Sequence, residues 1–433
     1  MHHLPGLFLC LTACVALMAL PTFGPQPASA AITAPITDIA TGLPIRYPSY
    51  ITEYDGLLYF RGSINTSIPD TSLWRSNGST AEQVPGTTSS NGASDLAAYG
   101  GKLYYSNGGA SLWQYDPVGG AQQAPGSAAN LQNPEEMTPY GGKFYFRAAR
   151  FGSPSNIGIE LWTFDGTNQA PIDMFPGAGS SYPQHFIQYA GQLYFNACGT
   201  PGQGTELWRT NGVGTPTEAA RIYPNNGSSP ENFAVYNNQL YFSATEGVNG
   251  RELWRFDGTS ATLAANIVAG GQYSSSNPNN LAVYGSKLYF SATDGVHGYE
   301  LWSFDGTTAQ MVAEINPTPN PGNGDDFLMD SSPSDLTVFN GLLYFSADDG
   351  AHGRELWSFD GTTASMVADL NPGQYGSYAS ELTVYDGKLY FSADDGYVPG
   401  LRNLEPEVFV LTPEPATLGL LAAGALALLR RRR

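Results

Sequence analysis

The tryptophans recur at a nearly constant interval, and this interval restricts the fold more than any other feature of the sequence. All seven tryptophans follow a leucine, about 47 residues apart on average. They are Trp74, Trp113, Trp162, Trp208, Trp254, Trp302 and Trp357. An aromatic pair precedes each of them, and an eighth pair, Tyr390-Phe391, is followed by Glu407-Val408-Phe409 where Glu-Leu-Trp would stand. Self-similarity at a period of roughly 40–50 residues is typical of propellers and solenoids.

One regular repeat unit shows the local structure that the sequence favours. Residues 336–339 alternate in polarity and end at an Asn-Gly pair, a hairpin signal that leads into a second strand over 342–347. A polar loop follows, then a third strand over 355–359, an Asp-Gly turn and a fourth strand over 365–370. No stretch in the repeats keeps a helical period for three turns, which excludes a helical solenoid. Four antiparallel strands per repeat make one blade of a propeller.

The two ends of the repeat region predict how the ring closes. Residues 36–40 match the fourth strand of other units, whereas the last unit, over 382–411, stops after its third strand. Together they make one complete blade, and such closure removes free sheet edges. We therefore predict an all-β propeller of four-stranded blades over residues 31–411, with eight blades and an N-terminal strand that closes the ring. Seven blades is the alternative, if the least regular unit, around Trp113, is not a full blade.

The first 30 residues have the features of a secretory signal peptide. Residues 7–20 form an apolar run, and Ala28-Ser29-Ala30 fits the small-x-small pattern that signal peptidase reads. Cleavage there would expose Ala31. A lipoprotein cleavage box at residues 11–14 is the alternative, although the apolar run continues past Cys14. The mature chain would retain Cys198 alone, so no intramolecular disulfide is possible.

The C-terminal residues 412–433 form a second targeting segment. They contain Pro413-Glu414-Pro415, an apolar run over 418–429 and four terminal arginines. A helix over this run spans about 18 Å, against ~30 Å for the bilayer core, so we predict a short transmembrane helix that holds the chain only transiently. Outside the signal peptide and this tail we predict no helix.

This tail resembles the PEP-CTERM sorting signal of Gram-negative bacteria, in which Pro-Glu-Pro precedes a short apolar helix and an arginine cluster. The resemblance implies recognition of Pro413, Glu414 and Pro415 by an exosortase, which cuts the tail in the membrane. It also implies export to the cell surface or the extracellular space, by way of a membrane-arrested precursor.

The repeat itself resembles the ELWxxDGT repeat of bacterial surface proteins. The segments 160–167, 252–259, 300–307 and 355–362 carry the whole pattern. The unit at Trp208 has Asn-Gly in place of Asp-Gly, and two other units lack the glutamate. The resemblance implies secretion and a repeat architecture, and it carries no catalytic residues.

The glutamate of each Glu-Leu-Trp segment is the first candidate functional residue. Clustered carboxylates suit calcium, so these glutamates and the acids of nearby loops would be its ligands. Alternatively, each glutamate accepts hydrogen bonds from loop N–H groups and fixes a turn. One copy per repeat favours this structural role, because functional sites usually break symmetry. The glutamates are Glu160, Glu206, Glu252, Glu300, Glu355 and Glu407, and the loop acids are Asp294, Asp348, Asp349, Asp394 and Asp395.

The remaining motifs favour structure over chemistry. The Asp-Gly-Thr segments are predicted to be turns, and the tryptophans to be core between blades. His297 and His352 stand at equivalent loop positions, which is too little for a metal site. We find no G-x-S-x-G, H-E-x-x-H or phosphate loop. The sequence therefore predicts no catalytic residues and no cofactor, with calcium left open.

Charge and loop length narrow the function. Lys and Arg number 19 against 38 Asp and Glu, a net charge of −19, which argues against nucleic acid as a partner. Length varies mainly in the connections that a propeller places on one face, which predicts a binding surface there. The longest insertion, 317–333, carries Asp325 and Asp326.

These observations predict an exported, non-enzymatic protein of the cell surface or extracellular matrix, with a recognition, adhesion or structural role. Its partners would be signal peptidase, an exosortase, and extracellular polysaccharide or other surface proteins. The alternative is a secreted propeller enzyme, either a quinoprotein-like dehydrogenase or a glycan lyase. The tryptophan period suits a quinoprotein, but Cys198 alone cannot make the vicinal cysteine pair typical of its methanol-oxidising members.

Overall fold

The computed structural model describes most of the repeat region. The described residues are 30–33, 35–64, 71–87, 92–109, 111–126, 130–152, 156–177, 179–200, 202–271, 274–317, 330–396 and 405–413. The predicted signal peptide, the apolar run 418–429, Glu414-Pro415 and Asp325-Asp326 lie outside them. Ala31–Thr412 form one compact unit. The part of the chain that the structure describes is all β and holds no helix capable of crossing a membrane.

The strands fall into four groups by their order within a repeat unit. The first strands are β3 (Arg46–Tyr54), β7 (Ala93–Tyr99), β11 (Leu131–Tyr140), β15 (Gln184–Tyr189), β19 (Glu231–Tyr236), β23 (Asn279–Tyr284), β27 (Ser334–Phe339) and β31 (Ser380–Tyr385). The second strands are β4 (Leu57–Ser63), β8 (Lys102–Asn107), β12 (Lys143–Arg150), β16 (Gln192–Ala197), β20 (Gln239–Thr245), β24 (Lys287–Thr293), β28 (Leu342–Asp348) and β32 (Lys388–Ala393).

The outer half of each unit completes the set. The third strands are β5 (Ser72–Ser76), β9 (Leu112–Asp116), β13 (Ile157–Phe164), β17 (Glu206–Thr210), β21 (Arg251–Phe256), β25 (Tyr299–Phe304), β29 (Arg354–Phe359) and β33 (Glu407–Pro413). The fourth strands are β6 (Thr80–Gln83), β10 (Gly120–Gln123), β14 (Gln169–Ile172), β18 (Thr217–Ala220), β22 (Ala261–Ala265), β26 (Ala309–Ala313) and β30 (Ala364–Ala368). Two short strands, β1 (Ala30–Thr33) and β2 (Thr37–Asp38), precede them.

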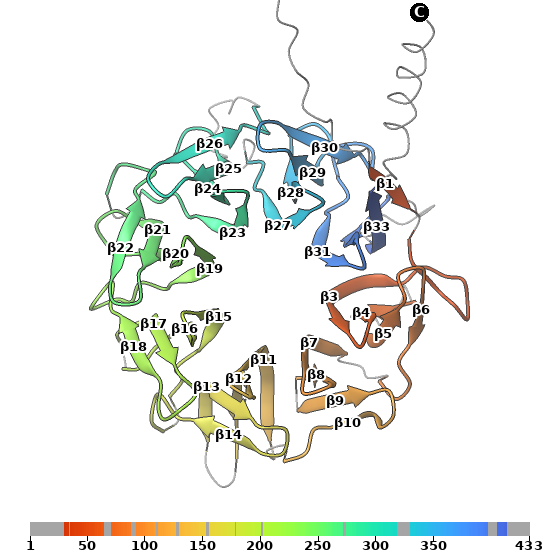
Figure 1. The fold of residues 1–433 in the computed structure, drawn as a ribbon, viewed down its shortest axis with the longest axis horizontal. Helices are drawn as coiled ribbons and strands as arrows, with labels where there is room; N and C mark the ends of the chain where they lie inside the picture. The colour runs from red at the N-terminus through yellow and green to blue at the C-terminus, as the bar shows by residue number, and fades with distance from the viewer. Residues whose placement is uncertain are drawn as a thin grey trace, which may run out of the picture. The chain divides into compact units, whose positions relative to one another are not determined.

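These strands form a propeller. Six sheets have four antiparallel strands in chain order, and a nine-stranded sheet joins the first and last units. That joint is a single pairing of Arg46 with Glu407. The first strands lie innermost, around the centre of Figure 1, and each contacts the first strand of the next unit. Strand β31 likewise contacts β3. The sequence therefore predicted the all-β class and the propeller arrangement of the sheets.

The predicted closing strand is wrong in its residues. Strand β1 pairs with β33, where the hydroxyl of Thr33 donates to the carbonyl of Val410 (3.3 Å). Residues 37–38, within the predicted segment, instead pair in parallel with β6 of the first unit. The sequence misled because Ile36 is buried against Val408 and Val410, as an inward residue of a fourth strand would be. Its N–H donates to the carbonyl of Val408 (2.9 Å), but the chain turns away after it.

Aromatic side chains form the core between neighbouring sheets. Trp162 is fully buried beside Phe144 and Phe146, and its indole N–H donates to the carbonyl of Ala148 (2.9 Å). Tyr104 of the preceding sheet packs edge-on against Phe164 at 5.4 Å between ring centroids. The core role predicted for the tryptophans is confirmed for the four buried ones. They are Trp74, Trp162, Trp254 and Trp302, whereas the other three are partly buried.

A ring of tyrosine hydroxyls ties each unit to the next. Seven first strands end in a tyrosine whose hydroxyl donates to a hairpin carbonyl of the following unit. Tyr284 donates to Gly341 (2.8 Å), and Tyr385 of the last unit donates to Gly56 of the first (2.5 Å). The eighth position, at the end of β27, is Phe339, which is 6% exposed.

We predict that Phe339→Tyr stabilises the protein by about 1 kcal/mol, because its hydroxyl would reach the equivalent hairpin carbonyl, that of Gly387. The reverse change, Tyr284→Phe, should cost a similar amount. Thermal unfolding of both variants beside the parent checks this. If Phe339→Tyr destabilises the protein, the site has no room for the hydroxyl.

Candidate functional site

The glutamate of the Glu-Leu-Trp segment fastens its strand to the segment that leads into the next sheet. Glu252 is fully buried, and its carboxylate accepts hydrogen bonds from the N–H of Ile267 (2.8 Å), the N–H of Ser276 (3.0 Å) and the hydroxyl of Ser276 (2.5 Å). Four other glutamates bond a buried serine in the same way. These pairs are Glu160–Ser181, Glu206–Ser228, Glu300–Ser331 and Glu355–Ser377. The structural role favoured from the sequence is confirmed for these five residues.

Glu407 differs from the other five glutamates. It lies 3.7 Å from the guanidinium of Arg46, which also pairs with Glu405 at 3.2 Å. Burial raises the pKa of Glu407 to about 7, with Asp395 adding to the shift and Arg46 opposing it. The last unit thus replaces the serine contact by an ion pair with the first unit.

Burial also raises the pKa of the fastening glutamates, although the hydrogen bonds that they accept oppose the shift. The pKa of Glu300 rises to about 7 from an ordinary value of 4.5. A carboxyl with a raised pKa binds its proton more tightly in the folded chain, so stability falls as pH rises between these two values. The pKa of His297, raised by Asp294, acts in the same direction.

We therefore predict a higher melting temperature at pH 5.5 than at pH 8. Calorimetry across this range checks the sign, and Glu300→Gln should flatten the dependence because the amide does not titrate. A melting temperature that rises steadily from pH 5.5 to pH 8 would contradict the assignment.

The loop acids bond within their own loops. Asp294 accepts the N–H of Val296 and pairs with the imidazole of His297 (2.7 Å), and Asp349 pairs with His352 in the same way (2.8 Å). Asp394 accepts the N–H of Gly396 (2.8 Å). Within the described ranges, no three His, Cys, Asp or Glu side chains gather as a metal site would require. The structure therefore does not bring these acids together with the Glu-Leu-Trp glutamates.

The Asp-Gly-Thr segments are turns, as predicted. Asp305 accepts the N–H groups of Thr307 and Thr308 (both 2.8 Å) and the hydroxyl of Thr307 (2.7 Å). The hydroxyl of Thr307 contributes most to lowering the pKa of Asp305 to about 2. Cys198 is buried, and its thiol donates to the carbonyl of Thr200 (3.1 Å), which suits a structural residue.

Every first strand carries a β-bulge, and one polar side chain stands at each bulge. The register between first and second strands shifts there, for example between Glu231 and Ala234. The bulge residues share a φ of 55° to 60°, a left-handed conformation that few residues other than glycine adopt. They are Tyr50, Asp95, Glu136, His185, Asn232, Asn280, Asp335 and Glu381. We call this set the bulge ring.

Side chains of the bulge ring bond from unit to unit around the centre. Where such a bond forms, the side chain of one bulge residue accepts the N–H of the bulge residue that follows. The bonds run from Glu136 to Asp95 (2.9 Å), His185 to Glu136 (2.9 Å), Asn280 to Asn232 (3.4 Å), Glu381 to Asp335 (3.3 Å) and Tyr50 to Glu381 (3.0 Å). The last of these joins the two ends of the repeat region.

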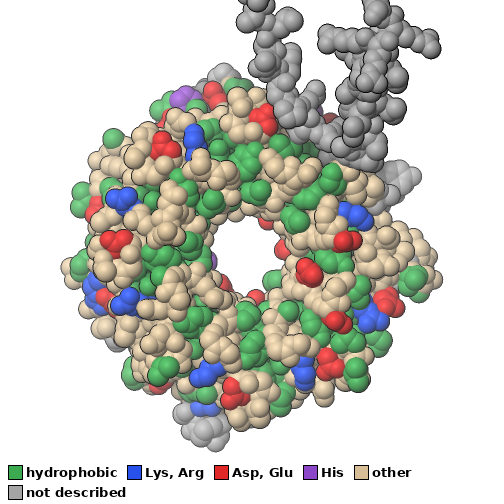
Figure 2. All heavy atoms as spheres, viewed as in Figure 1, with side chains coloured by type: hydrophobic (Ala, Val, Ile, Leu, Met, Phe, Trp, Pro, Cys, Tyr) green, Lys and Arg blue, Asp and Glu red, His purple; other side chains and the backbone are tan. Residues whose placement is uncertain are grey.

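The bulge ring makes one side of the central opening acidic. Asp335, Glu381, Asp95 and Glu136 belong to four units that flank Tyr50, while the opposite units carry asparagine. Figure 2 shows acidic side chains at the rim of the opening. Burial raises the pKa of Asp95 to about 6 and shifts those of Asp335 and Glu381 in the same direction. Such a rim repels anions and offers carboxylate acceptors to neutral or cationic groups.

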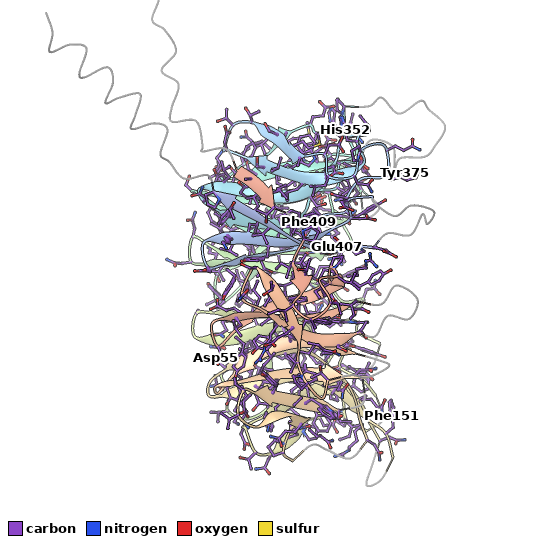
Figure 3. The ribbon with its side chains drawn as sticks, turned by 90° about the vertical axis from the view of Figure 1, so that its right-hand side faces the viewer. Asp55, Phe151, His352, Tyr375, Glu407 and Phe409 are labelled. Carbon is purple, nitrogen blue, oxygen red and sulfur yellow. The ribbon has the colours of Figure 1, made fainter. Side chains whose placement is uncertain are left out.

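The connections of variable length emerge on one face, which we call the loop face. Figure 3 shows Phe151, His352 and Tyr375 toward this face and Asp55 toward the opposite one, the hairpin face. Phe151 and His352 lie between second and third strands, and Tyr375 lies between two units. Phe151 and Tyr375 are more than half exposed.

Sequence reasoning missed the bulge ring, although a signal was present. A proline stands two residues before the bulge residue in six of the units, and an alanine in the other two. Proline restricts the residue before it to extended backbone, which suits a strand that begins just before a bulge. The prolines are Pro48, Pro134, Pro183, Pro230, Pro278 and Pro333. Hydrophobic patterning does not register this motif, because it marks the polar start of each strand.

The comparison with protein families identifies the end of the chain. Residues 411–433 match the family described as the PEP-CTERM protein-sorting motif. This match confirms the predicted sorting tail and shows an exported protein with a C-terminal sorting signal. Motifs of this kind are processed by exosortases, so an exosortase is a partner consistent with the match. None of the curated proteins compared matches the chain.

Solved structures share the fold at low sequence identity. The computationally designed Ika8 protein is 12% identical, with a TM-score of 0.52 over 87% of this chain and 99% of that one. A prolyl endopeptidase structure is 11% identical, with a TM-score of 0.50 over 81% of this chain and 54% of that one. The β-propeller domain of the Trilobed protease from Pyrococcus furiosus is also similar (11%, TM-score 0.43, covering 75% and 98%). The chain thus spans about half of the endopeptidase, and the likeness concerns the fold alone.

Proposed function

We propose that this protein is an exported, non-enzymatic recognition or matrix protein that acts at the cell surface or in extracellular polymer. The C-terminal sorting signal over residues 411–433 carries the proposal, because it directs the chain out of the cytoplasm. The resemblance of the repeat to ELWxxDGT surface proteins supports the same location. A rigid ring that presents variable loops on one face suits binding.

We further propose that the ring is a closed propeller of eight blades. Eight first strands carry a bulge residue, and the unit around Trp113 has four strands. Three contacts join the last unit to the first: Tyr385 with Gly56, Glu381 with Tyr50, and Arg46 with Glu405. Strand β1 would supply the fourth strand of the last blade.

The surroundings of the acidic groups support a non-enzymatic role. Five of the six Glu-Leu-Trp glutamates bond backbone N–H and serine groups in the protein interior. The two exposed histidines pair with an aspartate of their own loop. These contacts stabilise turns and junctions that recur from unit to unit, and recurrence of this kind is typical of structural devices.

The proposal predicts two processing events and binding without turnover. Mass spectrometry of the extracellular protein should place its N-terminus at Ala31 and find no peptide from residues 420–433. The purified protein should bind extracellular polymer from the producing cells and leave the polymer length unchanged. An intact tail on surface material would favour a membrane tether, and depolymerisation would favour the enzyme alternative.

A further inference from the structure

A pocket of about 310 Å³ lies where the last unit meets the first on the loop face. Its walls come from strand ends at this face: the starts of β3 and β31, the end of β32 and the residue before β33. Residues from both ends of the repeat region therefore meet in it. Its volume is at the small end of the range for ligand pockets, roughly 300–1,000 Å³.

The lining combines aromatic rings, hydroxyls and carboxylates. Tyr47 and Tyr378 contribute rings, and the side chain of Tyr378 is about half exposed. Ser380 adds a hydroxyl, and Glu381 and Asp394 add carboxylates. No lysine or arginine is among the residues that line the pocket in the described part of the chain. The site therefore offers a flat apolar surface beside hydrogen-bonding groups, with no cation to attract an anion.

We propose that this pocket binds one pyranose unit of an extracellular polysaccharide without negative charge, either a neutral sugar or an amine-bearing one. The C–H face of the sugar would pack on the ring of Tyr378, and its hydroxyls would bond the serine and carboxylate groups. Glu381 belongs to the acidic side of the bulge ring, which excludes uronates by repulsion. This inference rests on the proposed function and names its ligand.

The equivalent pocket two units back lacks this combination. It has a volume of about 370 Å³ and is lined by Asn280, Ser332 and Arg354 among others. Ser332 stands there in place of Tyr378, and the guanidinium of Arg354 donates to the carbonyl of Ser332 (2.9 Å). The pocket between last and first units thus breaks the repeat symmetry, as a binding site would and a structural device would not.

Titration calorimetry with the mature secreted protein tests the proposal. The probes are hexasaccharides of glucose, glucosamine and galacturonate. We expect the first two to bind and galacturonate not to bind. Tyr378→Ala should weaken binding by about tenfold, and Glu381→Gln should weaken glucosamine binding more than glucose binding.

Two matched variants serve as controls. Tyr182 stands at the position equivalent to Tyr378, is also half exposed and lines neither pocket, so Tyr182→Ala should bind like the parent. Asp335→Asn controls in the same way for Glu381→Gln. Circular dichroism melting of each variant verifies the fold.

Several outcomes would overturn the inference. These are parental affinity in Tyr378→Ala, an equal loss in Tyr182→Ala, and preferred binding of galacturonate. A parent that binds native extracellular polymer but none of the hexasaccharides would overturn the pocket and leave the proposed function standing. A parent that binds neither would overturn both.

Discussion

Replacing Glu252 by alanine is expected to lower the free energy of unfolding by about 3–5 kcal/mol. The carboxylate is fully buried and accepts three hydrogen bonds, two of them from backbone N–H groups. A buried donor that loses its acceptor costs ~1–3 kcal/mol, and here three donors are affected together. Urea denaturation of the variant and the parent measures the loss.

The exposed Glu314 provides the control, since Glu314→Ala should change stability by less than about 0.5 kcal/mol. The double variant Glu252→Ala/Ser276→Ala should cost less than the sum of the single changes, because both remove the same bond. Equal costs for the Glu252 and Glu314 variants would show that the buried contact adds nothing to stability.

Deleting residues 31–33 from the mature chain is expected to cost about 2–4 kcal/mol and to promote aggregation. The deletion removes β1 and leaves β33 as an open sheet edge, with the loss of several backbone hydrogen bonds and the cover over Val408 and Val410. Thermal unfolding followed by light scattering reports both effects.

Replacing residues 31–33 by Val-Thr-Val should leave both properties close to those of the parent. Main-chain pairing needs strand formers at these positions and no particular side chain. A deletion variant that melts and scatters like the parent would show that β1 does not contribute to the stability of the ring.

The parts of the fold that could be predicted are those that repeat in the hydrophobic pattern. The strands expected at 336–339, 342–347, 355–359 and 365–370 correspond to β27 to β30, with ends that differ by no more than two residues. Each of these strands alternates or ends at a glycine turn, so local sequence determines it. The aromatic pair and the tryptophan then indicate which faces pack between sheets.

The parts that escaped prediction depend on contacts between distant residues. Ile36 looks like part of a fourth strand by composition, but its partner Val408 is at the other end of the repeat region. The bulge ring escaped for a different reason. Its members share a backbone conformation and a position, while their side chains range from Tyr50 to His185 and Glu381, so a search by residue type finds no motif.

The direction of β33 decides which face of the ring is presented when the protein is held by its C-terminus. Third strands begin at the loop face and run to the hairpin face, so Pro413, the last residue of β33, lies on the hairpin face. Ala31 lies there too, because the hydroxyl of Thr412 donates to its carbonyl (3.3 Å). Both signals that steer the chain to the membrane are therefore connected to the same side of the disc. Attachment through either signal would turn the loop face, and the pocket at Tyr378, toward the surroundings of the cell.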